Sequence, residues 1–207
     1  MFDAVLFDFG GVILTSPFQA FADYERQAGL PPDLIRTINA TNPHDNAWAR
    51  LERSESDLPA FAREFEAEAA VLGHRVDGTE VLRCLQGELR PRMVAALRTC
   101  GQHHATALLT NNFLTGDPSW SSGGSFAAVI ELFDVVVESS QVGVRKPEPR
   151  FYEIALQRLG VAAERAVFLD DLGVNLKPAR AMGMTTIKVT DPDAALDELG
   201  ALLGLQL

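Results

Sequence analysis

Residues 4–12 read Ala4-Val5-Leu6-Phe7-Asp8-Phe9-Gly10-Gly11-Val12, an apolar run that leads into an aspartate and a glycine pair. An unbroken apolar run predicts a strand buried on both faces, as in a parallel sheet. The glycines allow the backbone to turn sharply where this strand stops. Asp8 is therefore expected at the carboxyl edge of a central strand, where open α/β sheets bind ligands. By itself the pattern still favours a simpler alternative, an aspartate that caps a helix.

The composition is ordinary for a soluble globular enzyme. The chain has 207 residues, 47% hydrophobic and 22% charged, which suits one large domain or a core with a smaller insertion. Its net charge of −10 predicts a surface that repels nucleic acid and membranes, so neither is an expected partner. No apolar run is long enough for a membrane span, and no signal peptide is expected. Cys84 and Cys100 lack metal-type spacing and are expected to be reduced, which predicts a cytoplasmic location.

From Pro17 the pattern is helical for about eighty residues. Helices are expected over Pro17 to Gly29, from 31–33 onward, around Trp48 and Leu51, after Ser56 or Asp57, and over Pro91 to Cys100. The helix after Asp57 is expected to bury Phe61, Phe65, Ala69 and Leu72 on one face. Residues 16–90 are interpreted as an inserted α-helical cap domain, and residues 1–15 and 91–207 as the core domain.

From residue 105 strand and helix patterns alternate. Strand-like runs cover residues 105–109, 135–137, 166–169 and 185–189, and helical patterns cover 150–159, 176–182 and 194–203. This alternation predicts βαβ units, and hence an α/β fold with a doubly wound parallel sheet. Residues 113–125 have loop composition throughout, and are expected to border the pocket or a subunit contact, or to form an exposed loop.

Polar groups follow the strand-like runs. Thr110-Asn111-Asn112 and Asp170-Asp171 each end one run, and Lys146 lies shortly after another. In a parallel sheet these groups and Asp8 meet at one edge, which capping alone does not explain. Carboxylates gathered without a counter-charge raise one another's pKa, and a hard divalent cation such as Mg²⁺ resolves that conflict. Lys146 supplies a positive charge for a bound anion, and Thr110 and Asn111 supply hydrogen-bond donors.

Four segments resemble the ordered motifs of the haloacid dehalogenase-like (HAD) hydrolase superfamily, and the helical insertion resembles the cap of its first subfamily. These segments are Asp8-Phe9-Gly10-Gly11-Val12, Leu109-Thr110-Asn111, Arg145-Lys146-Pro147 and Phe168-Leu169-Asp170-Asp171. Within the superfamily the chain is most similar to the N-terminal phosphatase domain of soluble epoxide hydrolases. Residues 138–149 and 168–180 carry that likeness.

The resemblance implies a role for each matching residue. Asp8 would be the catalytic nucleophile that forms an aspartyl phosphate. Thr110 and Asn111 would bind the transferred phosphoryl group, and Lys146 would neutralise charge on both the nucleophile and the phosphate.

The same resemblance implies a magnesium site. Asp8, Asp171 and the backbone carbonyl of Gly10 would ligate Mg²⁺. Asp170 would be a neighbour of the site or a ligand through water, with a catalytic role. Asn175 is expected either to support this acidic pair or to lie on a helix surface.

Residue 10 departs from the family pattern. Phosphatases of the superfamily usually carry an aspartate there, which protonates the leaving alcohol and activates water, whereas this chain has Gly10. Positioned proton transfer is worth about 10²–10⁴-fold, so a slower phosphatase is expected. Asp170, or a carboxylate from the cap, is a hypothetical partial substitute.

The sequence therefore predicts a magnesium-dependent phosphatase that acts on a small or lipid-like phosphomonoester. Its partner is a small phosphorylated molecule, and the oligomeric state, monomer or homodimer, is left open. One alternative is a 2-haloacid dehalogenase, which needs no acid at Gly10 but usually has tyrosine there and no metal. The other is a catalytically weak protein that binds phosphate or a partner.

Overall fold

The computed structural model describes residues 1–111 and 125–207, and the chain divides into two compact units. One unit contains Met1–Thr15 and Glu88–Leu207, and the other contains Ser16–Gly87. The segment predicted as a loop, 113–125, lies outside the described residues except for its last member. None of the described helices is long and apolar enough to cross a membrane.

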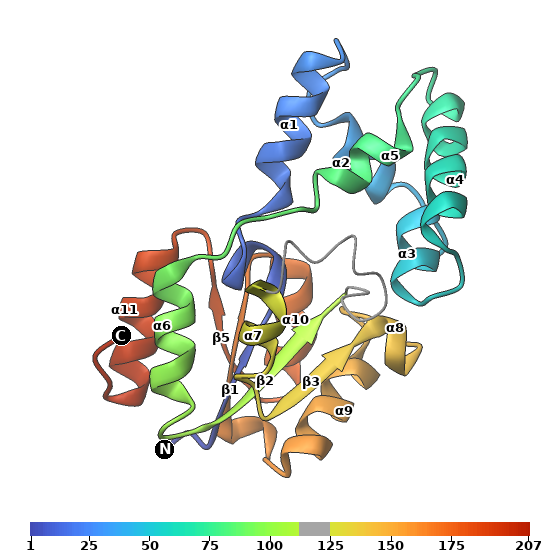
Figure 1. Ribbon diagram of the computed structural model, residues 1–207. Coiled ribbons are helices and arrows are strands. Elements are labelled where there is room, and N and C mark those ends of the chain that lie inside the picture. The colour runs from blue at the N-terminus through green and yellow to red at the C-terminus, as the bar shows by residue number, and fades with distance from the viewer. Residues whose placement is uncertain (112–124) are drawn as a thin grey trace. The chain divides into compact units, whose positions relative to one another are not determined.

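The first unit is built on a five-stranded, wholly parallel sheet with the strand order β3-β2-β1-β4-β5 (Figure 1). The strands are β1 (Ala4–Phe7), β2 (Ala105–Thr110), β3 (Val135–Glu138), β4 (Ala166–Asp170) and β5 (Thr185–Lys188). All five lie where the sequence predicts them, and the α/β fold is confirmed. The chain runs outward from β1 to β3, returns to β4 and continues to β5, so β1 is at the centre of the sheet.

Helices cover both faces of this sheet, which explains why β1 has no polar residue. Val5 and Phe7 belong to one apolar cluster, and Ala4 and Leu6 belong to another on the opposite face. The first face is covered by α6 (Pro91–Cys100), α7 (Ser125–Ile130) and α11 (Pro192–Leu203). The second face is covered by α9 (Pro149–Leu159) and α10 (Gly173–Ala181). Three shorter elements complete the unit: η1 (Phe9–Ile13), α8 (Ser139–Val142) and η2 (Ala163–Arg165).

The chain rejoins the core unit at Glu88, three residues before the predicted domain boundary. Leu89 forms an isolated antiparallel bridge with Leu14. The Thr15 amide donates to the Glu88 carbonyl at 2.8 Å, and the Arg90 amide donates to the Ile13 carbonyl at the same distance. This local pairing has no periodic signal in the sequence. A role for the helical unit as a cap over the site stays a prediction.

The second unit consists of five helices. They are α1 (Pro17–Gln27), α2 (Leu34–Ala40), α3 (Ala47–Glu52), α4 (Leu58–Val71) and α5 (Gly78–Arg83). Asp57 caps α4 as predicted, because its Oδ1 accepts from the Ala60 amide at 2.7 Å. Phe61, Phe65 and Ala69 of α4 are fully buried, but Leu72 is 40% exposed because the helix ends one residue earlier. Helix α5 was not predicted, since it begins with glycine and is only six residues long.

Aromatic packing forms the core of the helical unit. The Trp48 ring lies 4.7 Å from the Phe61 ring and 6.5 Å from the rings of Phe21 and Phe65, measured between centroids. Phe18 contacts Phe21 at 6.2 Å.

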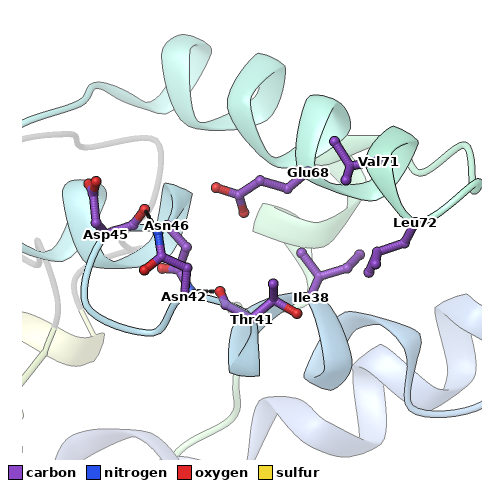
Figure 2. Close-up of a pocket in the computed structure, with 8 residues that line it drawn as sticks. All are labelled: Ile38, Thr41, Asn42, Asp45, Asn46, Glu68, Val71 and Leu72. Atoms are coloured by element: carbon purple, nitrogen blue, oxygen red, sulfur yellow. Dashed lines mark hydrogen bonds between the residues drawn. The ribbon is translucent and has the colours of Figure 1, made fainter.

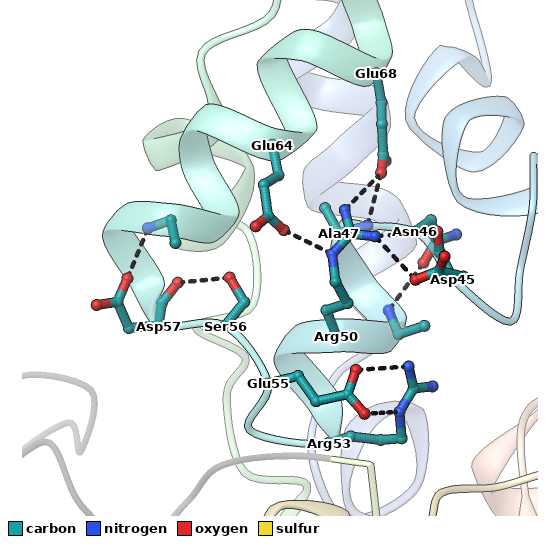
Figure 3. A network of polar contacts seen from close by, with 12 residues as sticks. Asp45, Asn46, Ala47, Arg50, Arg53, Glu55, Ser56, Asp57, Glu64 and Glu68 are labelled. Carbon is teal, nitrogen blue, oxygen red and sulfur yellow. Dashed lines mark hydrogen bonds and ion pairs between the residues drawn. The ribbon is translucent and has the colours of Figure 1, made fainter.

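Polar contacts also join α3 to α4 (Figure 3). Arg50 of α3 forms ion pairs with Glu64 of α4, Nε to Oε2 at 3.0 Å, and with Asp45, Nη1 to Oδ1 at 3.0 Å. Glu68 of α4 lies 3.6 Å from Arg50 and accepts from the Ala47 amide at 2.7 Å. The helix pair is therefore held by one guanidinium that is shared among three carboxylates.

Candidate active site

The parallel sheet brings the polar residues at the carboxyl ends of its strands to one edge. Phe7 of β1 is in register with Leu108 of β2 and Leu169 of β4, so the carboxyl ends of these three strands coincide. Asp8 follows β1, Thr110 ends β2 and Asp170 ends β4. This edge is the position where ligands bind in open parallel sheets, because helix α6, which leads from β1 to β2, and helix α10, which leads from β4 to β5, lie on opposite faces of the sheet.

Lys146 lies between two of the aspartates. Its Nζ is 2.8 Å from Asp8 Oδ1 and 2.7 Å from Asp170 Oδ2. The ammonium group is almost completely enclosed, since the Lys146 side chain is 1% exposed, the Asp170 side chain 0% and the Asp8 side chain 11%. Buried charges are tolerated only where they are paired and hydrogen-bonded, so these three side chains form one electrostatic unit.

Asp8 lies at the ligand-binding edge of the sheet and also caps a helical turn, so the two roles considered for it from the sequence are not exclusive. Besides pairing with Lys146, Asp8 Oδ1 accepts from the Phe9 amide at 2.6 Å and so caps the turn η1. Both contacts involve the same oxygen, which fixes the orientation of the carboxylate at the end of β1.

Burial is the main cause of an unusual ionisation at this site. It raises the pKa of Asp8 to about 8, with Asp170 and Asp171 adding repulsion and Lys146 opposing the rise. Burial alone would lower the pKa of Lys146, but attraction by Asp170 and Asp8 outweighs it and raises the pKa of this ammonium group. Lys146 therefore stays charged at neutral pH, and one ammonium faces three acidic side chains.

The acidic side chains can accommodate a cation. Asp8, Asp170 and Asp171 each offer a carboxylate oxygen, and these oxygens lie within 4.8 Å of one another. An all-oxygen donor set of this kind suits a hard divalent cation. The residues present therefore fit a metal site.

Asp170 is already surrounded by donors. Besides Lys146, it accepts from the Leu172 amide at 2.8 Å and from Asn175 Nδ2, which lies 3.1 Å from each of its oxygens. Asn175 is buried, and its carbonyl accepts from the Tyr152 hydroxyl at 2.7 Å. The interpretation of Asn175 as a support for the acidic pair is confirmed. Asp8 and Asp171 are left as the side chains better suited to contact a metal directly.

Asn111 has a contact that sequence reasoning missed. Its Nδ2 donates to the Lys146 carbonyl at 2.8 Å, and its Oδ1 accepts from the Lys146 amide at 2.7 Å. The side chain thereby fixes the backbone of the central lysine, 35 residues further along the chain. Its predicted role in phosphoryl binding stays a prediction. Thr110 is 3% exposed and lies opposite Glu138 of β3.

The two glycines after Asp8 differ. A Cβ atom on Gly11 would lie 2.2 Å from Asp171 Oδ2, and the residue has φ +81°, so the site requires glycine here. A Cβ atom on Gly10 would meet no atom within 4 Å, and its φ of −71° and ψ of 127° suit any residue. Only Gly11 is therefore demanded by the backbone and by Asp171.

A small cavity of about 140 Å³ lies within the helical unit (Figure 2). It is lined by Ile38, Thr41, Asn42, Asp45, Asn46, Glu68, Val71 and Leu72. None of these is a predicted site residue. Asn46 already donates to the carbonyls of Asn39 and Thr41 and accepts from the Ala49 amide, so its polar atoms stabilise the loop between α2 and α3.

The chain is similar to known proteins along nearly its whole length. A family model described as haloacid dehalogenase-like hydrolase matches residues 2–183. "Bifunctional epoxide hydrolase 2" of Sus scrofa is 33% identical over 219 residues, which cover 99% of this chain and 39% of that protein. "Sesquiterpene phosphatase astK" of Aspergillus oryzae is 30% identical over 207 residues, 98% of this chain and 97% of that protein.

A solved structure has the same fold. It is a HAD family enzyme of Bacteroides thetaiotaomicron in complex with magnesium and inorganic phosphate, with a TM-score of 0.60 and 17% identity. The match covers 91% of this chain and 94% of that one. The chain spans only 19% to 39% of the length of several curated relatives. The resemblance seen in the motifs is confirmed, and the chain belongs to the haloacid dehalogenase-like hydrolase family.

Proposed function

We propose that this chain is a magnesium-dependent phosphatase that hydrolyses a small or lipid-like phosphomonoester through an aspartyl phosphate on Asp8. The observation that carries the proposal is the buried contact of Lys146 Nζ with Asp8 and Asp170, beside a cluster of three carboxylates. This arrangement combines a fixed carboxylate, a permanent positive charge and a place for a cation.

Asp8 attacks phosphorus in the first step. A bond forms between a carboxylate oxygen and phosphorus, and the bond to the leaving oxygen breaks. Oδ1 is held by Lys146 and by the Phe9 amide, which presets the orientation of the nucleophile. Water then attacks phosphorus, releases inorganic phosphate and restores the carboxylate.

Lys146, Thr110 and Asn111 bind the transferred group. The ammonium of Lys146 stabilises the charge that accumulates on the phosphoryl oxygens, and its burial strengthens that effect. Thr110 ends the neighbouring strand β2 and Asn111 follows it, and both donate to the same oxygens. Asn111 also keeps Lys146 in position through its two hydrogen bonds to the lysine backbone.

Asp8, Asp171 and the carbonyl of Gly10 would hold the Mg²⁺ ion. When bound, the ion would neutralise negative charge shared by the carboxylates and the phosphate. The raised pKa of Asp8 supports this assignment, because an ionised Asp8 among two other carboxylates calls for a second cation besides Lys146. The related Bacteroides enzyme binds magnesium and phosphate together.

Curated relatives support a phosphatase in particular. The Aspergillus relative, matched along almost its whole length, is named as a phosphatase of a sesquiterpene. A Mycobacterium tuberculosis relative, 31% identical, is also named as a phosphatase. Both names are consistent with the proposed reaction.

A panel of phosphomonoesters, assayed with magnesium and with a chelator, tests the proposal. The wild type should release phosphate only with magnesium, and Asp8→Asn should release none. Asp197→Asn, a matched change at an exposed position, should retain wild-type activity. Phosphate release by Asp8→Asn would exclude Asp8 as the nucleophile.

The same assay separates the alternatives. Halide release from a 2-haloacid in the presence of chelator would favour a dehalogenase. No turnover across the panel, with phosphate still bound, would favour the weakly catalytic phosphate-binding protein that Gly10 suggests.

A further inference from the structure

We infer that the described residues of the core unit provide no general acid for the leaving group, so the substrates are phosphate esters and anhydrides whose leaving group departs as a stable anion. Aryl and acyl phosphates form this class, whereas simple alkyl phosphates do not. The inference rests on the proposed phosphatase function and narrows its substrate.

The first observation is the open space beside Gly10. Gly10 is two positions after Asp8. A Cβ atom at Gly10 would have no other atom within 4 Å. The backbone there is in an ordinary conformation, so the fold does not require glycine. Residue 10 therefore has no side chain that could donate a proton, and backbone strain does not account for the glycine.

The second observation is that Asp170 is poorly placed to replace the missing acid. It is completely buried, and Lys146, Asn175 and the Leu172 amide all donate to its oxygens. Both of its oxygens therefore face donors of the protein, and neither is directed at a leaving group.

Lys146 and Asp171 are also committed to other contacts. The Lys146 ammonium is 1% exposed and donates to Asp8 and Asp170. Asp171 packs its carboxylate against Gly11 and belongs to the acidic cluster. Asp170, Lys146 and Asp171 are thus each engaged in other contacts at this edge.

The chemistry of the first step then selects the substrate. As Asp8 forms its bond to phosphorus, the leaving oxygen takes the electron pair of the breaking bond without receiving a proton. A phenol with a pKa of about 10 or a carboxylic acid with a pKa of about 4 tolerates this charge. An alkoxide resembles hydroxide, whose parent water has a pKa of about 16, and leaves far more slowly.

The test compares kcat/KM for aryl phosphates of graded leaving-group pKa with that for an alkyl phosphate such as glycerol phosphate. We expect a steep dependence on leaving-group pKa in the wild type. Gly10→Asp should raise kcat/KM for the alkyl phosphate by about 10²–10⁴-fold and make the dependence shallower. Gly10→Asn adds a side chain of the same size without an acid and should leave the aryl-to-alkyl ratio near that of the wild type.

The wild-type series is decisive even if a variant at residue 10 does not fold. Equal hydrolysis of alkyl and aryl phosphates by the wild type would overturn the inference, because an acid from another part of the chain would then be acting. Equal effects of Gly10→Asp and Gly10→Asn would also overturn it. Either result leaves the phosphatase proposal intact, whereas phosphate release that is independent of Asp8, or absent for every substrate, overturns both.

Discussion

Two clusters in this molecule each bring one cation together with three carboxylates, in very different surroundings. In the core, Lys146 is 1% exposed and contacts Asp8 and Asp170, with Asp171 beside them. In the helical unit, Arg50 is 29% exposed, and its partner Asp45 is 71% exposed. Water screens the second cluster, whereas the first is enclosed, and its charges are balanced by one another and by hydrogen bonds from the protein.

The comparison indicates where electrostatic energy can be used for chemistry. The half-buried Arg50 cluster joins two helices, and partial burial raises the pKa of Glu68 there. In the Lys146 cluster, burial raises the pKa of Asp8 to about 8, with repulsion from Asp170 and Asp171 adding to the rise. Burial, rather than the number of charges, therefore separates a structural contact from a candidate active site.

The largest effect is expected for Lys146→Ala. Removal of one partner leaves Asp8 and Asp170 buried without their cation, which should lower the free energy of unfolding by about 3–5 kcal/mol. Phosphatase activity should fall by about 10²–10³-fold or more, since the charge that stabilises the transition state is lost. Urea unfolding and kcat measure the two effects, with Lys177→Ala on the exposed face of α10 as the control. A loss below 1 kcal/mol would show that the two clusters do not differ as proposed.

A smaller effect is expected from pH. The pKa of Asp8 rises from 3.8 to about 8 on folding, so the protonated carboxyl favours the fold. Its contribution is present at low pH and is lost as the pH rises toward 8. Without metal, the wild type should therefore lose about 2 kcal/mol relative to Asp8→Asn between pH 6.5 and pH 8.5.

Unfolding in urea at the two pH values measures this difference. Magnesium should restore the stability of the wild type at pH 8.5 and have little effect on Asp8→Asn. Asp197→Asn, which is exposed, should follow the wild type at both pH values. A difference that does not depend on pH would mean that Asp8 is ionised throughout.

The smallest effect is expected for Arg50→Ala. Because its partners remain in contact with water, the free energy of unfolding should fall by less than about 1 kcal/mol. A double-mutant cycle with Glu64→Ala isolates the ion pair, and added salt should weaken it. If Arg50→Ala were as destabilising as Lys146→Ala, exposure would not be the property that distinguishes the clusters.

Local patterns predicted most of the fold. Strands β1 to β5 and the long helices were found because burial leaves a periodic signal in nearby residues, and because caps such as Asp57 act within one turn. The short helix α5 and the pairing of residues 88–90 with 13–15 were missed. Neither segment is long enough to show a periodic pattern of apolar residues.

By itself the sequence determined the family and the residues at the carboxyl edge of the sheet, since ordered motifs and apolar runs are read along the chain. Only the tertiary structure decided how those residues are used. It places the Asn111 side chain against the Lys146 backbone, and it separates Gly10, with open space, from Gly11, with Asp171 against it. Such contacts join atoms that are distant in the chain, and their distances depend on packing that no local pattern records.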